Sequence, residues 1–237
     1  MNDEIRKEKT RKIVGTFVLI SFIVPIVFLI YRIVVSSNEL PTEIYTRTRS
    51  DYVLMLVQCI LGVFALMLPT FVSRKYKVQI PTNMYMLYVV FLYGAIFLGE
   101  VRNFYYNVPH WDTILHTFSG AMIGALGFSF VSLMNKEENI PLNLTPFFVA
   151  FFAFCFAVTL GVIWEIYEFT FDGILGLNMQ KFALEDGTGL IGRAALSDTM
   201  KDLVVDAIGA FVMSVIGYIS LKYKKGWVEK LLIKKEE

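Results

Sequence analysis

The sequence has few charges and few of the side chains that build disulfides and histidine clusters. Only 18% of its 237 residues are charged, and a formal net charge of +1 gives no reason to expect a nucleic-acid partner. Two histidines are too few for a histidine-rich metal cluster, and there is no recognisable nucleophile motif. No inverted repeat of the kind common in secondary transporters is detectable either.

Both cysteines lie in the middle of long apolar runs. At that depth the thiols of Cys59 and Cys155 are expected to be free and packed among apolar side chains, not joined in a disulfide or bound to a ligand. A cleavable signal peptide is not expected. The first apolar run is long, contains Pro25 and lacks a small-residue cleavage site before the next charged loop.

Apolar side chains are abundant instead. They make up 56% of the chain, and the mean hydropathy of +0.57 is too high for an ordinary soluble domain. We predict an all-α fold, a polytopic membrane helix bundle that forms one membrane domain over residues 1–237. Six transmembrane helices are expected near 13–32, 52–72, 82–101, 111–134, 144–169 and 202–221.

Basic residues predict the orientation of these helices. They gather before the first apolar run, in the loop after the second, and in the tail 222–237, which is expected to lie in the membrane interface. The positive-inside rule therefore places both termini in the cytoplasm. The short loop with Lys136, Glu137 and Glu138 is then expected on the same side.

The fourth run opens with His110-Trp111-Asp112-Thr113-Ile114-Leu115-His116. Asp112 and His116 are four residues apart, so on a helix they share one face, about 6 Å from each other. Inside a membrane an ionisable side chain costs about 2.5–3.5 kcal/mol or more, which makes the pair a functional hypothesis. His110 falls in the preceding loop and is expected to be a surface histidine.

Further acids fall near the same depth. With the predicted orientation, Glu165 in the fifth run and Asp206 in the sixth each lie roughly one turn below the outer end of their helix, as does His116. Glu168 and Asp202 lie nearby, whereas the inner halves of these runs carry no charge. Scattered structural charges would not be expected to gather at one depth on three helices.

Two interpretations of this convergence stay open. One is a buried polar network that holds the bundle together, with Arg193 or Lys201 paired against the acids. The other is a divalent-metal site, because so many carboxylates near hydrocarbon raise each other's pKa unless a cation joins them. Oxygen-rich ligation favours Mg²⁺, Mn²⁺ or Ca²⁺, and Zn²⁺ is possible with three or four ligands. The candidate ligands are Asp112, His116, Glu165, Glu168, Asp202 and Asp206.

The fourth run also carries small residues at helical spacing. Gly120 and Gly124 form a small-xxx-small pair, which predicts close packing against another helix.

The motif from His110 to His116, followed by Gly120, resembles an element of a bacterial inner-membrane family typified by the protein YjdF. Trp164 to Glu168 and Asp198 to Ala210 are similar to later elements of that family. This resemblance implies a location in the bacterial cytoplasmic membrane.

The order of parts also resembles VanZ-like membrane proteins, with the pattern D-x3-H, E-x2-Q and R…D-x3-N-x2-G. The matching positions are Asp112, His116, Glu165, Arg193, Asp202 and Gly209. Glu168 stands in place of the glutamine and Asp206 in place of the asparagine, and the loop between Asp172 and Arg193 lacks a glycine-glutamine-glycine run. The resemblance covers about residues 100–210 and implies a role in the cell envelope.

Three functions are compatible with these features. The first is a metal-dependent hydrolase or transferase that acts on lipid or envelope-precursor headgroups at the outer leaflet, with membrane lipids as partners and an amphiphilic substrate. Its candidate catalytic residues are Asp112, His116 and Glu165, and its candidate substrate-binding residues are Arg102, Trp164 and Arg193. The alternatives are a cation- or proton-coupled transporter and a non-catalytic envelope protein.

Overall fold

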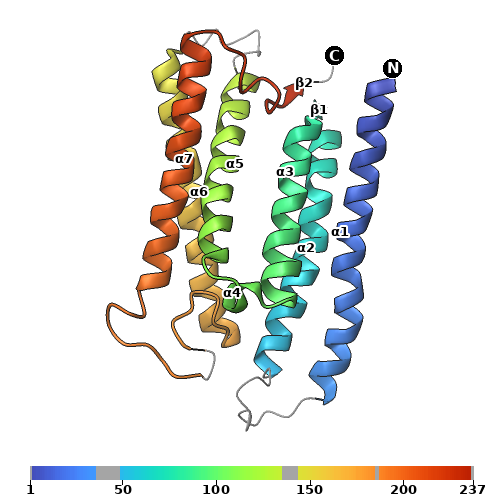
Figure 1. Cartoon of the computed structure of the whole chain (residues 1–237), viewed down its shortest axis with the longest axis vertical. Coiled ribbons are helices and arrows are strands. Elements are labelled where there is room, and N and C mark those ends of the chain that lie inside the picture. The colour runs from blue at the N-terminus through green and yellow to red at the C-terminus, as the bar shows by residue number, and fades with distance from the viewer. Residues whose placement is uncertain (1, 36–48, 135–143, 185–186, 236–237) are drawn as a thin grey trace.

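The computed structural model describes residues 2–35, 49–134, 144–184 and 187–235. In this part of the chain six helices are long and apolar enough to cross a membrane, and they run side by side along the long axis of the molecule (Figure 1). The prediction of an all-α membrane helix bundle is therefore confirmed. The expected cytoplasmic loop with Lys136, Glu137 and Glu138 lies outside the described residues.

Each predicted apolar run corresponds to one long helix. The helical elements in chain order are α1 (Asn2–Val35), α2 (Arg49–Tyr76), α3 (Thr82–Leu92), the π-helix η1 (Tyr93–Val101) that continues α3, the single turn α4 (Phe104–Asn107), α5 (Trp111–Met134), α6 (Pro146–Leu175) and α7 (Ser197–Lys222). Two short strands, β1 (Val78–Gln79) and β2 (Lys234–Lys235), pair in antiparallel orientation.

Local sequence signals set the ends of α6. Thr145 precedes the helix and its hydroxyl accepts a hydrogen bond from the Phe148 backbone N–H at 3.3 Å, while Pro146 occupies the first turn. Gly176 ends the helix with a φ of 65°, a left-handed conformation that glycine adopts without steric cost. Helix α6 therefore extends six residues beyond the 144–169 run, to Leu175.

The longer helices change the depth of two candidate site residues. Glu165 lies about 15 Å from the end of α6 at Leu175, and Asp206 lies about 14 Å from the start of α7 at Ser197. His116 is only about 8 Å into α5. The expectation that all three lie one turn below a helix end is wrong for Glu165 and Asp206, because the polar residues that flank both apolar runs are also helical.

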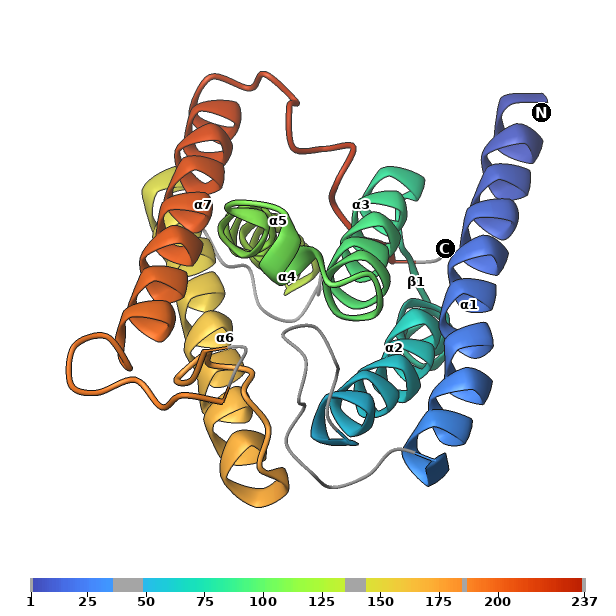
Figure 2. The same cartoon turned by 60° about the horizontal axis from the view of Figure 1, so that its bottom comes forward.

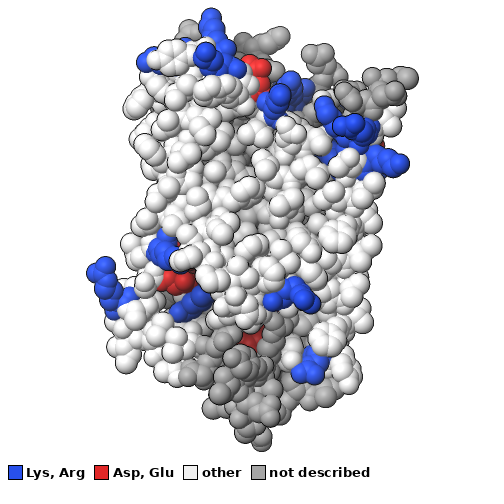
Figure 3. All heavy atoms as spheres, in the orientation of Figure 1, with Lys and Arg blue, Asp and Glu red and all other residues white. Residues whose placement is uncertain are grey.

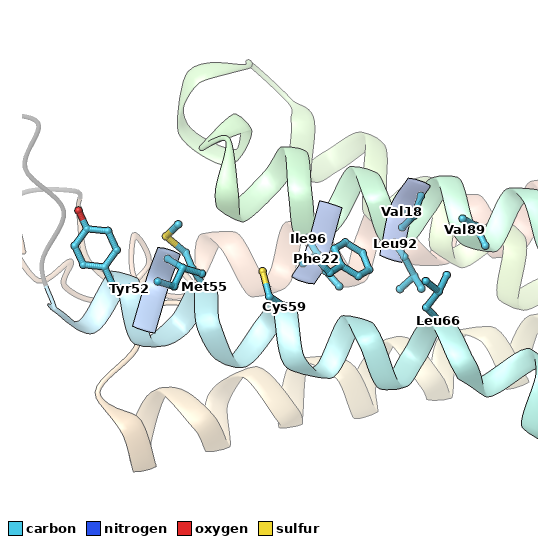
Figure 4. Close-up of a cluster of buried hydrophobic side chains, with 10 residues drawn as sticks. Val18, Phe22, Tyr52, Met55, Cys59, Leu66, Val89, Leu92 and Ile96 are labelled. Atoms are coloured by element: carbon cyan, nitrogen blue, oxygen red, sulfur yellow. The ribbon is translucent and has the colours of Figure 1, made fainter. Parts of the chain in front are cut away.

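The helices form two groups of three. Helices α1, α2 and α3, with η1, enclose one apolar core, whose labelled side chains point toward each other in Figure 4. Its fully buried members include Phe22, Cys59 and Val89. Cys59 and Cys155 are both free thiols, as predicted.

Helix α5 joins the two groups. It lies between α3 on one side and α7 on the other in both views (Figures 1 and 2). On the α3 side, Phe118 stacks on Phe91 with ring centroids 6.2 Å apart. On the other side, Phe128 and Val131 share a core with Ala153 of α6.

The backbones of α5 and α7 approach each other closely at two glycines. A Cβ added at Gly120 would overlap the carbonyl oxygen of Asp206, and one added at Gly209 would overlap the carbonyl oxygen of Thr117. Gly124 packs against Met213 in the same interface. The predicted helix-packing role of the Gly120 and Gly124 pair is therefore confirmed, with α7 as the partner.

Both ends of the described chain lie at the same end of the bundle. The N-terminus, β1 and β2 are at the top of Figure 1, whereas α4 and the connection from α6 to α7 are at the bottom. The tail folds back onto the bundle: Val228 is buried and the Ile233 backbone N–H donates to the Ser129 hydroxyl at 3.2 Å. Basic side chains lie toward both ends and leave an uncharged middle band on the face in Figure 3.

We expect Gly120→Ala or Gly209→Ala to lower the free energy of unfolding by about 1–3 kcal/mol, because a methyl group at either position forces α5 and α7 apart. Thermal unfolding of the detergent-purified protein would measure the effect. Gly173→Ala is the matched control: Gly173 lies in α6 with no atom within 4 Å of its added Cβ. Equal melting temperatures for all three variants would contradict the close-packing argument.

The basic residues predict that the end of the bundle with α4 faces outward. Single cysteines at Asn107 and Ile191, in a chain with both native cysteines replaced by alanine, should react with an impermeant thiol reagent added to intact cells. Both positions are exposed, and Ile191 is 89% exposed. Cysteines at Lys75 and Lys225, at the opposite end, should react only after lysis; the reverse pattern would invert the proposed topology.

Candidate functional site

The site is built around the N-terminal turn of α5. Trp111, its first residue, donates a hydrogen bond from the indole Nε1 to the Gly94 carbonyl at 3.2 Å and packs edge-on against Phe104, with centroids 5.1 Å apart. These contacts fix the start of the helix against η1. They place Asp112 at the rim of the bundle and His116 one turn deeper.

The imidazole of His116 lies among three aspartates. Its Nδ1 is 3.2 Å from Oδ2 of Asp206, and its Nε2 is 3.6 Å from Oδ1 of Asp112 and 3.9 Å from Oδ2 of Asp202. Asp202 and Asp206 are four residues apart, so they lie on one face of α7. One ring nitrogen therefore faces a single carboxylate, and the other faces two.

Two of these aspartates are almost completely buried. Asp206 is 4% exposed and accepts a second hydrogen bond, from the Ser119 hydroxyl at 2.9 Å. Asp202 is 2% exposed, and its Oδ1 has no hydrogen-bond partner among the described residues. Asp112, His116 and Asp202 each offer one ligand atom, and these atoms lie within 4.8 Å of one another.

The two glutamates of α6 border this group. Glu165 and Glu168 are 5% and 8% exposed. The Trp164 indole donates a hydrogen bond to Oε1 of Glu168 at 2.9 Å, so Trp164 orients the Glu168 carboxylate. Neither oxygen of Glu165 has a hydrogen-bond partner in the described chain, although the side chains of Gln180 and Thr199 approach it.

Lys181 is the site residue that sequence reasoning missed. It lies in the connection from α6 to α7, and its ammonium forms an ion pair with Asp112 and a second one, at 3.8 Å, with Asp198. It also lies 5.0 Å from the centre of the Tyr105 ring. Burial lowers the pKa of Lys181, but the carboxylates of Asp112 and Asp198 outweigh burial and raise this pKa above its usual value.

Asp172 explains how a loop residue reaches the site. Its two carboxylate oxygens accept hydrogen bonds from the backbone N–H groups of Met179, at 2.8 Å, and Gln180, at 3.0 Å. The next residue, Lys181, has a φ of 47°, which turns the chain sharply. No helical periodicity marks a lysine held in this way, so its place in the site follows only from the folded loop.

The expectation that Arg193 or Lys201 pairs with the acids is wrong. Arg193 and Lys201 form no ion pair with the acids in the described residues, and Lys181 takes that place. Arg193 lies in the turn before α7 and lines a groove on the exposed face of that helix. Arg102 is exposed at the end of η1 and likewise forms no ion pair with these acids in the part of the chain described. His110 is exposed in the loop, as expected.

The acids of the site outnumber its cations. Asp112, Asp198, Asp202, Asp206 and the two glutamates of α6 surround one imidazole and one ammonium. Carboxylates this close do not all stay ionised in a low-dielectric bundle without added protons or a further cation. The arrangement is thus able to hold a cation or to store protons.

The match to known proteins covers most of the chain but identifies no solved relative. A protein of Thermotoga maritima described as an uncharacterized protein is 34% identical over 130 residues, which cover 54% of this chain and 57% of that protein. The chain therefore spans little more than half the length of this relative. No solved structure matches. A model of the family described as predicted membrane protein (DUF2238) matches residues 17–223, and the chain belongs to this family.

Proposed function

We propose that the protein is a metal-dependent membrane enzyme that hydrolyses or transfers the headgroup of a phosphate- or ester-linked lipid. The observation that carries the proposal is the meeting of Asp112, His116 and Asp202, whose ligand atoms lie within 4.8 Å of one another. A buried carboxylate oxygen of Asp202 lacks a hydrogen-bond partner in the described residues. A divalent cation would satisfy that oxygen and offset the excess negative charge.

Asp206 acts on the imidazole and not on the metal in this proposal. A hydrogen on Nδ1 of His116 is donated to Asp206, 3.2 Å away, which leaves the lone pair of Nε2 directed at the side of Asp112 and Asp202. A carboxylate on the far nitrogen of a metal-bound histidine is a common arrangement, because it fixes the tautomer and raises the basicity of the ligand. We therefore assign the metal to Asp112, His116 Nε2 and Asp202.

Three protein ligands leave positions open for substrate and water. Two carboxylates and one imidazole suit Mn²⁺, Mg²⁺ or Zn²⁺, and a cation of this kind supplies Lewis acidity toward a phosphoryl or acyl oxygen. Glu165 is the candidate general base, since it is buried beside the group and neither of its oxygens has a hydrogen-bond partner in the described chain.

A lipid is the substrate class that this location favours. The acids lie among helices whose outward faces are apolar, including Ile166 and Val204, which are 58% and 53% exposed. The motif order similar to VanZ-like proteins and the resemblance to the YjdF-type family support a role in the cell envelope. Localisation in the bacterial cytoplasmic membrane, with the site facing outward, belongs to the same proposal.

One observation favours the polar-network alternative. The Lys181 ammonium already pairs with Asp112 and Asp198, so it supplies part of the positive charge that a metal would supply. A transporter has less support, because the other half of each helix is uncharged. No charged side chain follows His116 in α5, precedes Glu165 in α6, or lies between Asp206 and Lys222 in α7.

We expect about one divalent metal ion per chain in protein purified without chelators, measured by elemental analysis. Asp202→Asn and His116→Ala should each lower the metal content to a small fraction, because each removes one of three ligands. Glu8→Gln is the control, since Glu8 is an exposed acid of α1 that pairs with Lys12 and lies at the other end of the bundle. Wild-type protein free of metal would favour the polar network.

Glu165→Gln should keep the metal and the fold but lower the rate of headgroup release by about 10²-fold or more, because the amide cannot accept a proton from water. Release of phosphate or headgroup from a panel of membrane lipids is the measurement, with metal content and melting temperature recorded for the same samples. Wild-type rates in the variant would remove Glu165 from the mechanism. If metal-loaded wild type attacks no lipid in the panel, the enzyme proposal fails.

A further inference from the structure

A groove lies at the start of α7, on the exposed face of the helix and not on the face that carries the buried Asp202 and Asp206. It has a volume of about 540 Å³ and is lined by Arg193, Leu196, Ser197, Met200, Lys201 and Val204. The four lining residues within α7 follow the spacing i, i+3, i+4 and i+7, so they lie on one face of the helix. Arg193 and Leu196 come from the turn that leads into it.

The groove combines two positive side chains with an apolar floor. Arg193 and Lys201 form no ion pair within 4 Å in the described chain, although Lys201 lies near enough to Asp198 for an electrostatic interaction. Leu196, Met200 and Val204 are 63%, 54% and 53% exposed. A soluble anion would need the charges but would gain nothing from these apolar side chains.

The order of these groups along α7 follows the depth of a lipid. Lys201 lies about 6 Å from the helix start at Ser197, and Val204 about 10 Å. Exposed apolar side chains continue below them at Ile208 and Phe211, which are 52% and 60% exposed. Positive charge thus lies where a headgroup would be, and apolar surface lies where an acyl chain would be.

We propose that this groove binds the phosphate of one anionic phospholipid, with an acyl chain laid along α7. The Arg193 guanidinium donates paired hydrogen bonds to two phosphate oxygens, Lys201 adds a second positive charge, and the Ser197 hydroxyl donates a third contact. The backbone N–H groups at the start of α7 have no side-chain cap, so they also favour a negative charge there.

The groove and the acidic group lie on different faces of α7. Lys201 directly precedes Asp202, and consecutive helical residues point in different directions, so a phosphate bound in the groove lies at the level of Asp202 but on the exposed side of α7. The lipid bound in this groove is therefore not assigned as the substrate of the proposed enzyme. The binding itself does not depend on metal or catalysis.

Full-length protein in phosphatidylcholine nanodiscs, titrated with labelled phosphatidylglycerol, tests the binding. Wild type should bind phosphatidylglycerol about tenfold or more tightly than labelled phosphatidylcholine. Arg193→Gln with Lys201→Gln should abolish that preference, because both positive charges that contact the phosphate are lost. Lys75→Gln with Lys225→Gln, exposed cations at the other end of the bundle, is the matched control and should retain it.

Two further measurements distinguish failure of the lipid site from failure of the proposed function. Inorganic phosphate should not displace the lipid at millimolar concentration. The lipid site is overturned if phosphate displaces the lipid with an affinity similar to that of the lipid. It is also overturned if the Arg193 and Lys201 variant keeps its preference for phosphatidylglycerol. Asp202→Asn should lose metal and still prefer phosphatidylglycerol. Lipid preference in a wild-type protein without metal would refute the proposed function and leave this binding site supported.

Discussion

The close contact between α5 and α7 is the constraint on which the site depends. Because Gly120 and Gly209 have no side chain, the backbones meet at the carbonyl oxygens of Asp206 and Thr117. At this separation the Asp206 carboxylate lies within 3.2 Å of the His116 ring, and Asp202, one turn earlier, lies beside Nε2 of the same ring. Larger residues at the two glycines would separate the acids from the imidazole even if every polar residue were kept.

Helix α6 completes this arrangement by the same means. A Cβ at Gly161 would lie 2.9 Å from Oδ2 of Asp206, so the absence of a side chain admits the carboxylate between α6 and α5. Glu165 is one turn further along α6 and is buried on the same side. Close helix packing and burial of charge therefore occur at the same place: α5, α6 and α7 come into close contact at the glycines beside Asp206.

The sequence predicts the helices well because long apolar runs have few alternatives in a membrane, where every backbone polar group must be satisfied within a helix. It also predicts that Asp112 and His116 share one face of α5, since helical spacing fixes which residues of one helix lie together. The helix ends were harder to predict. Residues such as Asp172 and Asp198 continue α6 and α7 although they are polar, and hydropathy alone cannot extend a span through them.

The place of Lys181 was beyond prediction for a related reason. It depends on Asp172 accepting two backbone hydrogen bonds and on a left-handed residue in a loop, neither of which leaves a periodic signal. Its ammonium is directed at Oδ2 of Asp112, while Oδ1 of the same carboxylate faces His116. A metal on the His116 side, as proposed, would therefore take a different oxygen of Asp112 from the ammonium. The two cations would share this carboxylate and repel each other across it, so movement of the loop that carries Lys181 would change the affinity of the proposed metal site.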